Sequence, residues 1–197
     1  MVNVKVSKIS EDRISQGDIF KNIEFIEYVA YYEGEIEVSS IIFPYVIVLT
    51  QDCDLFQDHS NRLAEKKDQD KYILSVIVAP LYNAEHVYKG EHLAELDLTM
   101  GKILKDKTPG TNLRNNDNPR YHYIEFPTDI SITESVIDFK HYFTVNSQYL
   151  LNIKDKNWIC KIRALYREQI SQRFSYYLSR IGLPEIKDIK NTSTLII

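Results

Sequence analysis

The sequence is poor in cysteine and has no closely spaced cysteine pair. Its 197 residues contain two, Cys53 and Cys160, which lie far apart. A CxxC zinc ribbon and a thioredoxin-type redox motif are therefore excluded. We expect both residues to be free, buried thiols of a protein in the reducing cytoplasm.

Long hydrophobic segments are also missing. No apolar run in the sequence approaches the roughly 18 residues that a membrane-spanning helix needs. Residues 1–13 lack the hydrophobic region of a signal peptide. We therefore expect a cytoplasmic localisation and no membrane partner.

An excess of basic residues, which broad binding to nucleic acid requires, is absent as well. The chain has 24 Lys and Arg against 28 Asp and Glu, a net charge of −4. Non-specific attraction to a phosphate backbone is therefore disfavoured, although a local basic patch is compatible with this total. The apolar fraction of 44% is ordinary for a globular protein, and the length favours a single domain with its own core.

Two apolar runs dominate what the sequence does contain. One spans residues 45–49 and is followed by the polar segment 50–54; the other spans residues 72–79 and leads through Ala-Pro to a polar exit. Such β-branched runs are typical of strands buried on both faces. We expect a small twisted barrel with a cleft beside these strands. The side chains predicted to be buried are Val46, Val48, Ile77 and Val78.

The segment before the first run predicts a β-hairpin. Residues 24–32 and 35–42 flank Glu33-Gly34, which is typical of a tight turn. Ile36 and Val38 alternate with polar residues, so one face of this hairpin is expected to be wet and the other buried. A second turn is predicted at Gln16-Gly17-Asp18.

The remaining segments are assigned by periodicity and turn composition. We expect a charged, mobile connection with one helical turn over 57–71, a helix over 91–106 and a loop over 107–120. Strands are expected over 121–126 and within 135–145. The strongest helix prediction covers 164–181, with Gly182 as its cap and Pro184 as its stop.

Three short motifs carry a family resemblance. Gly17-Asp18, then Pro44 with a buried strand ending in Leu49-Thr50, then Val78-Ala79-Pro80-Leu81, resemble the MazF/PemK family. Members of that family are SH3-type β-barrels, and many are mRNA endoribonuclease toxins. The resemblance implies an α+β fold: one MazF-like domain over 1–190 with a helical and loop insertion at about 84–120, a C-terminal helix at about 164–181, and a tail over 191–197.

The departures from the family pattern concern its chemistry. Phe43 stands where the nucleases have the arginine that stabilises the scissile phosphate, and Tyr82 stands where they have a serine or threonine. Neither residue supplies the cation or the proton transfer that RNA cleavage needs near neutral pH. We therefore expect no catalytic residue, no cofactor and no metal site.

The resemblance then favours a non-catalytic regulatory protein. The chain is similar to a MazF-like anti-sigma protein of type III CRISPR antiviral systems, which holds a sigma factor until a Lon-type protease cuts it. The expected partners are therefore a sigma-factor-like protein and a regulatory protease. The alternative is an endoribonuclease toxin of a toxin–antitoxin pair, with RNA as its substrate. A third reading is a nucleic-acid-binding module that uses residues 107–123.

Two polar clusters have alternative interpretations. Asp52-Cys53-Asp54 is either a metal or thiol site or a strand-end turn in which Asp side chains cap backbone amides. The loop arginines and the residues after them either clamp single-stranded RNA or belong to a solvated loop that enters an ordinary strand. The expected partner-binding residues are Phe43, Tyr82, Asp52, Asp54, Arg114, Arg120 and His122.

Overall fold

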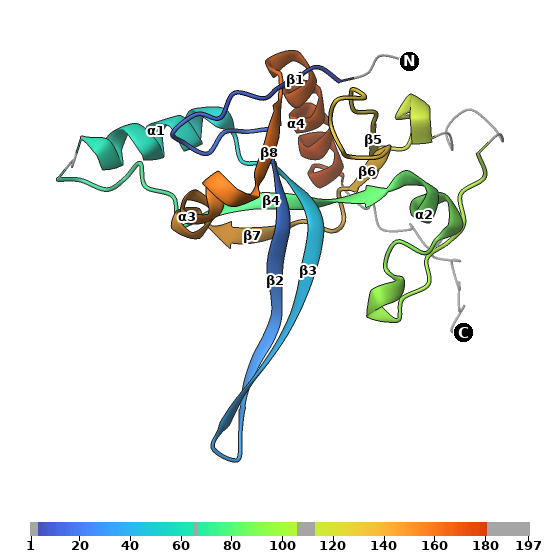
Figure 1. The fold of residues 1–197 in the computed structure, drawn as a ribbon, viewed down its shortest axis with the longest axis horizontal. Helices are drawn as coiled ribbons and strands as arrows, with labels where there is room; N and C mark the ends of the chain where they lie inside the picture. The colour runs from blue at the N-terminus through green and yellow to red at the C-terminus, as the bar shows by residue number, and fades with distance from the viewer. Residues whose placement is uncertain (1–3, 65–66, 106–112, 181–197) are drawn as a thin grey trace, which may run out of the picture.

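The computed structural model describes residues 4–64, 67–105 and 113–180, which form an α+β fold (Figure 1). No helix within these residues is long and apolar enough to cross a membrane. The elements in chain order are β1 Val6–Ser7, β2 Asp18–Tyr32, β3 Glu35–Val48, α1 Asp52–Leu63, β4 Ser75–Asn83, α2 Ala84–Lys89, η1 Ala94–Leu96, η2 Leu113–Asn115, β5 Tyr121–Ile124, β6 Ser135–Asp138, β7 Phe143–Asn146, α3 Ser147–Asn157, β8 Trp158–Ile162 and α4 Ala164–Leu178.

The strands form one antiparallel sheet that curves into an open half-barrel. Their order is β1-β8-β2-β3-β4-β6-β5, and β7 pairs with the first half of β4. The strand predictions at 121–126 and within 135–145 are confirmed as β5 and as β6 and β7. The long β2–β3 pair is the centre of the path, so it connects the two halves of the sheet.

The prediction of a central strand buried on both faces is confirmed. Val46 and Val48 pack in the cluster that includes α1 and α3, whereas Ile47 and Leu49 pack in the cluster that includes α4. All four side chains are at most 5% exposed. The alternation of β-strand side chains thus places this strand between two cores.

The second predicted strand is present as β4, with one difference. Val78 is fully buried, as expected, but Ile77 is only half-buried and packs at the margin of a core cluster. The strand begins at Ser75 and continues through Pro80 to Asn83. Pro80 is accommodated within the strand although it has no N–H to donate.

The predicted hairpin forms, but one of its expected faces is not buried. Glu33 and Gly34 both have positive φ, 49° and 93°, as a two-residue hairpin turn requires. Figure 1 shows the distal part of β2–β3 projecting away from the rest of the molecule. We call residues 24–42 the arm. Ile36 and Val38, predicted to face the core, are 71% and 53% exposed because no other element of the described residues covers them.

The base of the hairpin is fixed by a buried ionic group. Asp18 is 1% exposed and accepts hydrogen bonds from the backbone N–H of Ser15 at 2.8 Å and from Trp158 Nε1 at 2.9 Å. Lys154 of α3, itself 4% exposed, lies 3.2 Å from the same carboxylate. Burial raises the pKa of Asp18 in spite of these partners. The group ties β2, α3 and β8 together.

The connection over 57–71 was predicted to be mobile, and this is wrong for its first half. Residues 57–63 belong to the three-turn helix α1, whose buried Leu55 and Asp58 face the body. Asp58 accepts from Arg62 at 2.9 Å and from the backbone N–H of Ile73 at 2.8 Å, so the carboxylate joins the helix to the start of the next strand.

The predicted helix over 91–106 is also wrong within the described residues. This part contains the short η1 and irregular chain, while the helix of the insertion is α2, one turn earlier. Gly90 ends α2 with φ 75°, and a Cβ at this position would lie 2.2 Å from the Met100 carbonyl oxygen. Leu93 is buried and Met100 packs beside it without helical geometry. The apolar spacing reflects a folded-back chain, not a helix face.

The C-terminal helix is confirmed as α4, with Ile170 and Phe174 buried against the sheet. Leu165 and Leu178, which share the predicted helical pattern, are exposed instead. Gly182, Pro184 and the tail 191–197 lie outside the described residues. Both cysteines are free, but Cys53 is exposed, so the prediction of two buried thiols holds only for Cys160.

Candidate functional site

Phe43 and Tyr82, the two residues at the degenerate positions, line one cavity. Their ring centroids are 6.4 Å apart, with the rings at 83° to each other. The cavity has a volume of about 290 Å³ and is walled by β3, by β4 and by residues 91–96 of the insertion. The insertion therefore forms one side of the cleft that the sequence predicts beside the two buried strands.

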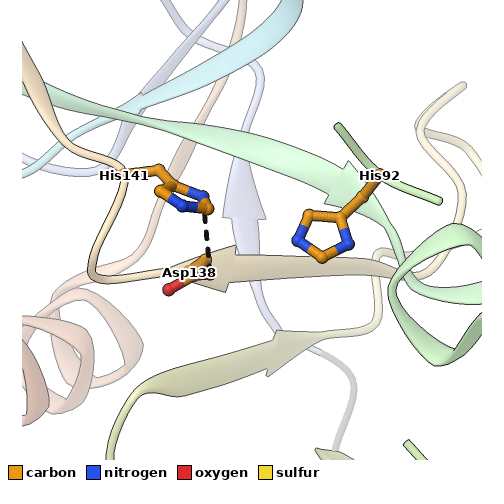
Figure 2. A group of neighbouring side chains, drawn as sticks. All are labelled: His92, Asp138 and His141. Carbon is orange, nitrogen blue, oxygen red and sulfur yellow. Dashed lines mark ion pairs between the residues drawn. The ribbon is translucent and has the colours of Figure 1, made fainter. Parts of the chain in front are cut away.

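Three polar side chains converge next to Tyr82, at the end of β6 (Figure 2). They are His92 from the insertion, Asp138 at the last position of β6, and His141 three residues later. One ligand atom from each lies within 4.8 Å of those of the other two. His141 Nδ1 is 3.4 Å from Asp138 Oδ2 and 3.3 Å from the Tyr82 hydroxyl.

Asp138 is the electrostatic centre of this group. Its side chain is completely buried, and it accepts from Arg120 Nε at 2.8 Å and from the backbone N–H of Lys140 at 3.0 Å. Arg120 also reaches the second carboxylate oxygen, so the pair is bidentate. A buried carboxylate with this many donors is held in a fixed orientation.

The neighbouring groups are uncharged at neutral pH. Burial lowers the pKa of His92 and of His141, and the charge of Asp138 opposes this shift only in part. Burial, followed by the Asp138 charge, raises the pKa of Tyr82 far above its ordinary value. The site thus combines two neutral imidazoles, a phenol and a carboxylate paired with arginine.

His92 has unsatisfied polar atoms. Both of its ring nitrogens are buried, and neither makes a hydrogen bond of acceptable geometry to any residue that the structure describes. The backbone carbonyl of His86 is close enough to favour the protonated ring, but less strongly than burial opposes it. Tyr82 packs against the imidazole with ring centroids 4.9 Å apart. A buried polar group without partners is uncommon in a folded protein.

The other predicted site residues lie in different surroundings. Arg114 pairs with Glu134 at 2.9 Å on the surface, whereas Arg120 belongs to the Asp138 group. His122 is only 3% exposed and packs near Phe139, and burial lowers its pKa to about 3. The loop that precedes them is described only from residue 113 onward.

Asp52 and Asp54 lie at the start of α1 and do not line the cavity. Asp52 accepts from Arg13 and from the backbone N–H of Gln16, both at 3.1 Å, and Arg167 lies 3.3 Å away. The Asp52 contacts correspond to the structural alternative for the cluster, in which a carboxylate fixes backbone amides after the strand. The exposed Cys53 sits between the two aspartates.

The sequence reasoning missed His92, Asp138 and His141. A usable signal was present, because the chain has five histidines and one of them, His141, comes three residues after Asp138 in the segment predicted to contain strands. The pattern does not show that the irregular chain of the insertion places His92 beside the end of β6. That contact depends on tertiary structure alone.

Comparisons with family models, with curated proteins and with solved structures give no match to this chain.

Proposed function

We propose that this protein is a non-catalytic binding protein that holds another protein through the arm. The observation that carries the proposal is an uncovered apolar face. The register places the partners Tyr31 and Ile36, and likewise Val29 and Val38, directly opposite one another. The exposed apolar side chains on this one face are Ile26, Val29, Tyr31, Ile36, Val38 and Ile42. A contiguous apolar patch of this kind is typical of a protein interface.

The charge of the arm indicates the chemistry of the partner. Residues 22–44 contain five glutamates and no Lys, Arg or His. Glu35 and Glu37 lie on the opposite face from the apolar side chains, because neighbouring strand residues alternate. A partner with an apolar surface and a basic rim complements this arrangement, whereas RNA is repelled. A DNA-binding protein such as a sigma factor has this character.

A second copy of the chain fits the arm less well. A symmetric dimer joins the same patch on both subunits. It would place two ribbons that carry five glutamates each against one another, with Glu24 of each on the joined face. No basic residue of the arm offsets that repulsion. The proposed occupant is therefore a different protein.

The resemblance to the MazF/PemK family supports the proposal. The antiparallel half-barrel is compatible with an SH3-type barrel, and the two degenerate positions, Phe43 and Tyr82, line a common cavity. In this proposal the cleft of the family is retained, but aromatic side chains stand at its nuclease positions. The arm provides the protein-binding surface. Release of a sigma-factor-like protein by a regulatory protease in antiviral defence is part of the same proposal.

One observation favours the alternative of an endoribonuclease. Arg120, His92 and His141 bring a cation and two imidazoles next to the family's second chemical position, Tyr82. Acid–base cleavage of RNA uses such groups. Against this, Arg120 is occupied by Asp138 on both carboxylate oxygens. Incubation of the protein with a long mRNA distinguishes the two: we expect no specific fragments.

A pair of adjacent substitutions tests the binding proposal. Val38→Asp places a charge on the apolar face, and Ser39→Asp places the same charge one residue along, on the opposite face. With the full chain as bait in the native host, we expect one stoichiometric protein with a basic surface to be captured by wild type and by Ser39→Asp, but not by Val38→Asp.

The proposal fails if the captured protein is retained by Val38→Asp, or if RNA or a second copy of the chain is the only bound species. Circular dichroism on both variants checks that the half-barrel is intact. High salt should weaken capture, since opposite charges contribute to it.

A further inference from the structure

We propose that His92, Asp138 and His141 form a binding site for a divalent transition-metal ion. This goes beyond the binding function above and departs from the expectation of no metal site. The three side chains offer two imidazole nitrogens and one carboxylate oxygen, all within 4.8 Å of one another. Figure 2 shows them converging from two separate segments of the chain.

The distances require little rearrangement. Ligand atoms bind Zn²⁺ at about 2.0–2.2 Å, so two of them on one ion are at most about 4.4 Å apart. His141 Nδ1 and Asp138 Oδ2, at 3.4 Å, already meet this limit. The His92 ring is the one that has to approach, and it lies in an irregular segment between α2 and η1 that can adjust.

The unsatisfied nitrogens of His92 are an independent indication of a ligand. Both are buried without a hydrogen-bond partner among the described residues. A metal ion accepts the lone pair of one ring nitrogen, and the other nitrogen can then donate to a backbone carbonyl, the common arrangement around ligating histidines.

The surrounding residues complete the site. Arg120 holds both carboxylate oxygens of Asp138, as a residue that orients a ligand does. A carboxylate has about four acceptor positions, so it can bind arginine and an ion together. The positive charge of Arg120 should weaken the site but favour an anionic further ligand.

The donor set indicates the class of ion. Two imidazoles and one carboxylate suit Zn²⁺, Co²⁺, Fe²⁺ or Ni²⁺, whereas Mg²⁺ and Ca²⁺ prefer oxygen ligands alone. Three protein ligands leave at least one coordination position open, as in metal sites that bind an exogenous ligand. Tyr82 and His92 also line the cavity, so an open position there is within reach of a small molecule.

The test is metal binding by the full chain without a histidine tag, after treatment with a chelator and dialysis. Isothermal titration with Zn²⁺ should give one ion per chain. Titration with Co²⁺ should give the intense visible absorption of a four- or five-coordinate ion, and Zn²⁺ should abolish that absorption. His92→Ala and His141→Ala should each remove this binding.

His59→Ala is the matched control, because His59 lies in α1 beside Asp12, outside the group and outside the cavity. It should bind one ion as wild type does. The proposal is overturned if wild type binds neither ion, or if both His92→Ala and His141→Ala bind as tightly as wild type. Circular dichroism confirms that the histidine variants are folded; Asp138 variants are avoided because Arg120 depends on this carboxylate.

Discussion

The two ends of the β2–β3 hairpin share the same antiparallel pairing but have opposite surroundings. Ile47 at the base of β3 is 1% exposed, whereas Ile36 in the arm of the same strand is 71% exposed. Both lie in regular antiparallel pairing with β2. At the base, α1, α3 and α4 supply the cores that cover the strand; in the arm, nothing in the described part of the chain does so.

The comparison shows that a strand pattern specifies pairing and faces, but not what covers them. Apolar side chains recur at alternate positions of the arm, although the described part of the chain provides no second layer of structure that would cover them. A two-stranded ribbon alone is marginally stable in water. A natural sequence that keeps an apolar face on such a ribbon is best explained by a cover from outside the chain.

The largest effect should come from breaking the ionic group at the base. Lys154→Met leaves the buried Asp18 carboxylate without its cation, which should lower the free energy of unfolding by about 3–5 kcal/mol. Urea denaturation measures the change. Lys156→Met, at an exposed position of the same helix, is the control and should change little. Equal effects of the two substitutions would contradict a stabilising role for the buried pair.

Replacing isoleucine by alanine once at the base and once in the arm tests the comparison between these two regions. Ile47→Ala removes fully buried methylene groups and should cost about 2–5 kcal/mol of unfolding free energy. Ile36→Ala should stay within about 0.5 kcal/mol, since the side chain is already in water. Thermal and urea unfolding provide the values. If Ile36→Ala were as destabilising as Ile47→Ala, the arm would have to be covered in the free protein.

Low pH should reduce the free energy of unfolding through the buried His122. Its pKa is about 3 in the folded chain and about 6.5 in an unfolded one. As the pH falls below 6.5, the unfolded state therefore takes up the proton first, and stability is lost. Between pH 7 and pH 5 this should amount to about 2 kcal/mol. The test is the difference in urea midpoint between the two pH values.

His122→Leu should show a flatter acid dependence by that amount, because the titrating group is gone. An unchanged pH dependence in His122→Leu would assign the acid sensitivity to other groups.

The smallest effect is expected at Tyr28. Its hydroxyl donates to Glu37 at 3.0 Å, and both groups are exposed on the acidic face of the arm. Tyr28→Phe should leave the unfolding midpoint and partner capture unchanged, because water replaces the lost contact. Loss of partner capture by Tyr28→Phe would instead indicate that the partner binds the acidic face of the arm.

The sequence was informative where a single local pattern decides the structure. The apolar run 45–49, the turn at Glu33-Gly34 and the helix from Ala164 follow from alternation, turn residues and periodicity, and all are present. Helix α1 was missed because its residues are mostly polar, and its position depends on buried contacts such as that of Asp58. The same limit explains why α3 was missed. Its buried Lys154 forms an ion pair with Asp18, a residue that is distant in the sequence.

The candidate site was predictable only in part. Phe43 and Tyr82 lie on neighbouring strands, so their joint cavity follows from the order of the sheet. His92 comes from a segment whose apolar spacing favours a helix that does not form. The exposure of the apolar face of the arm likewise cannot be predicted from the sequence, because it depends on whether another element packs against that face.

Hydrogen–deuterium exchange on the free chain and on its captured complex tests the central claim most directly. The account predicts that backbone amides of residues 24–42 exchange much more slowly in the complex, while those of the base, such as the amides of Val46–Val48, change little because the fold already protects them. Unchanged exchange over 24–42, with protection confined to other surfaces, would contradict the claim that the arm is where this protein holds its partner.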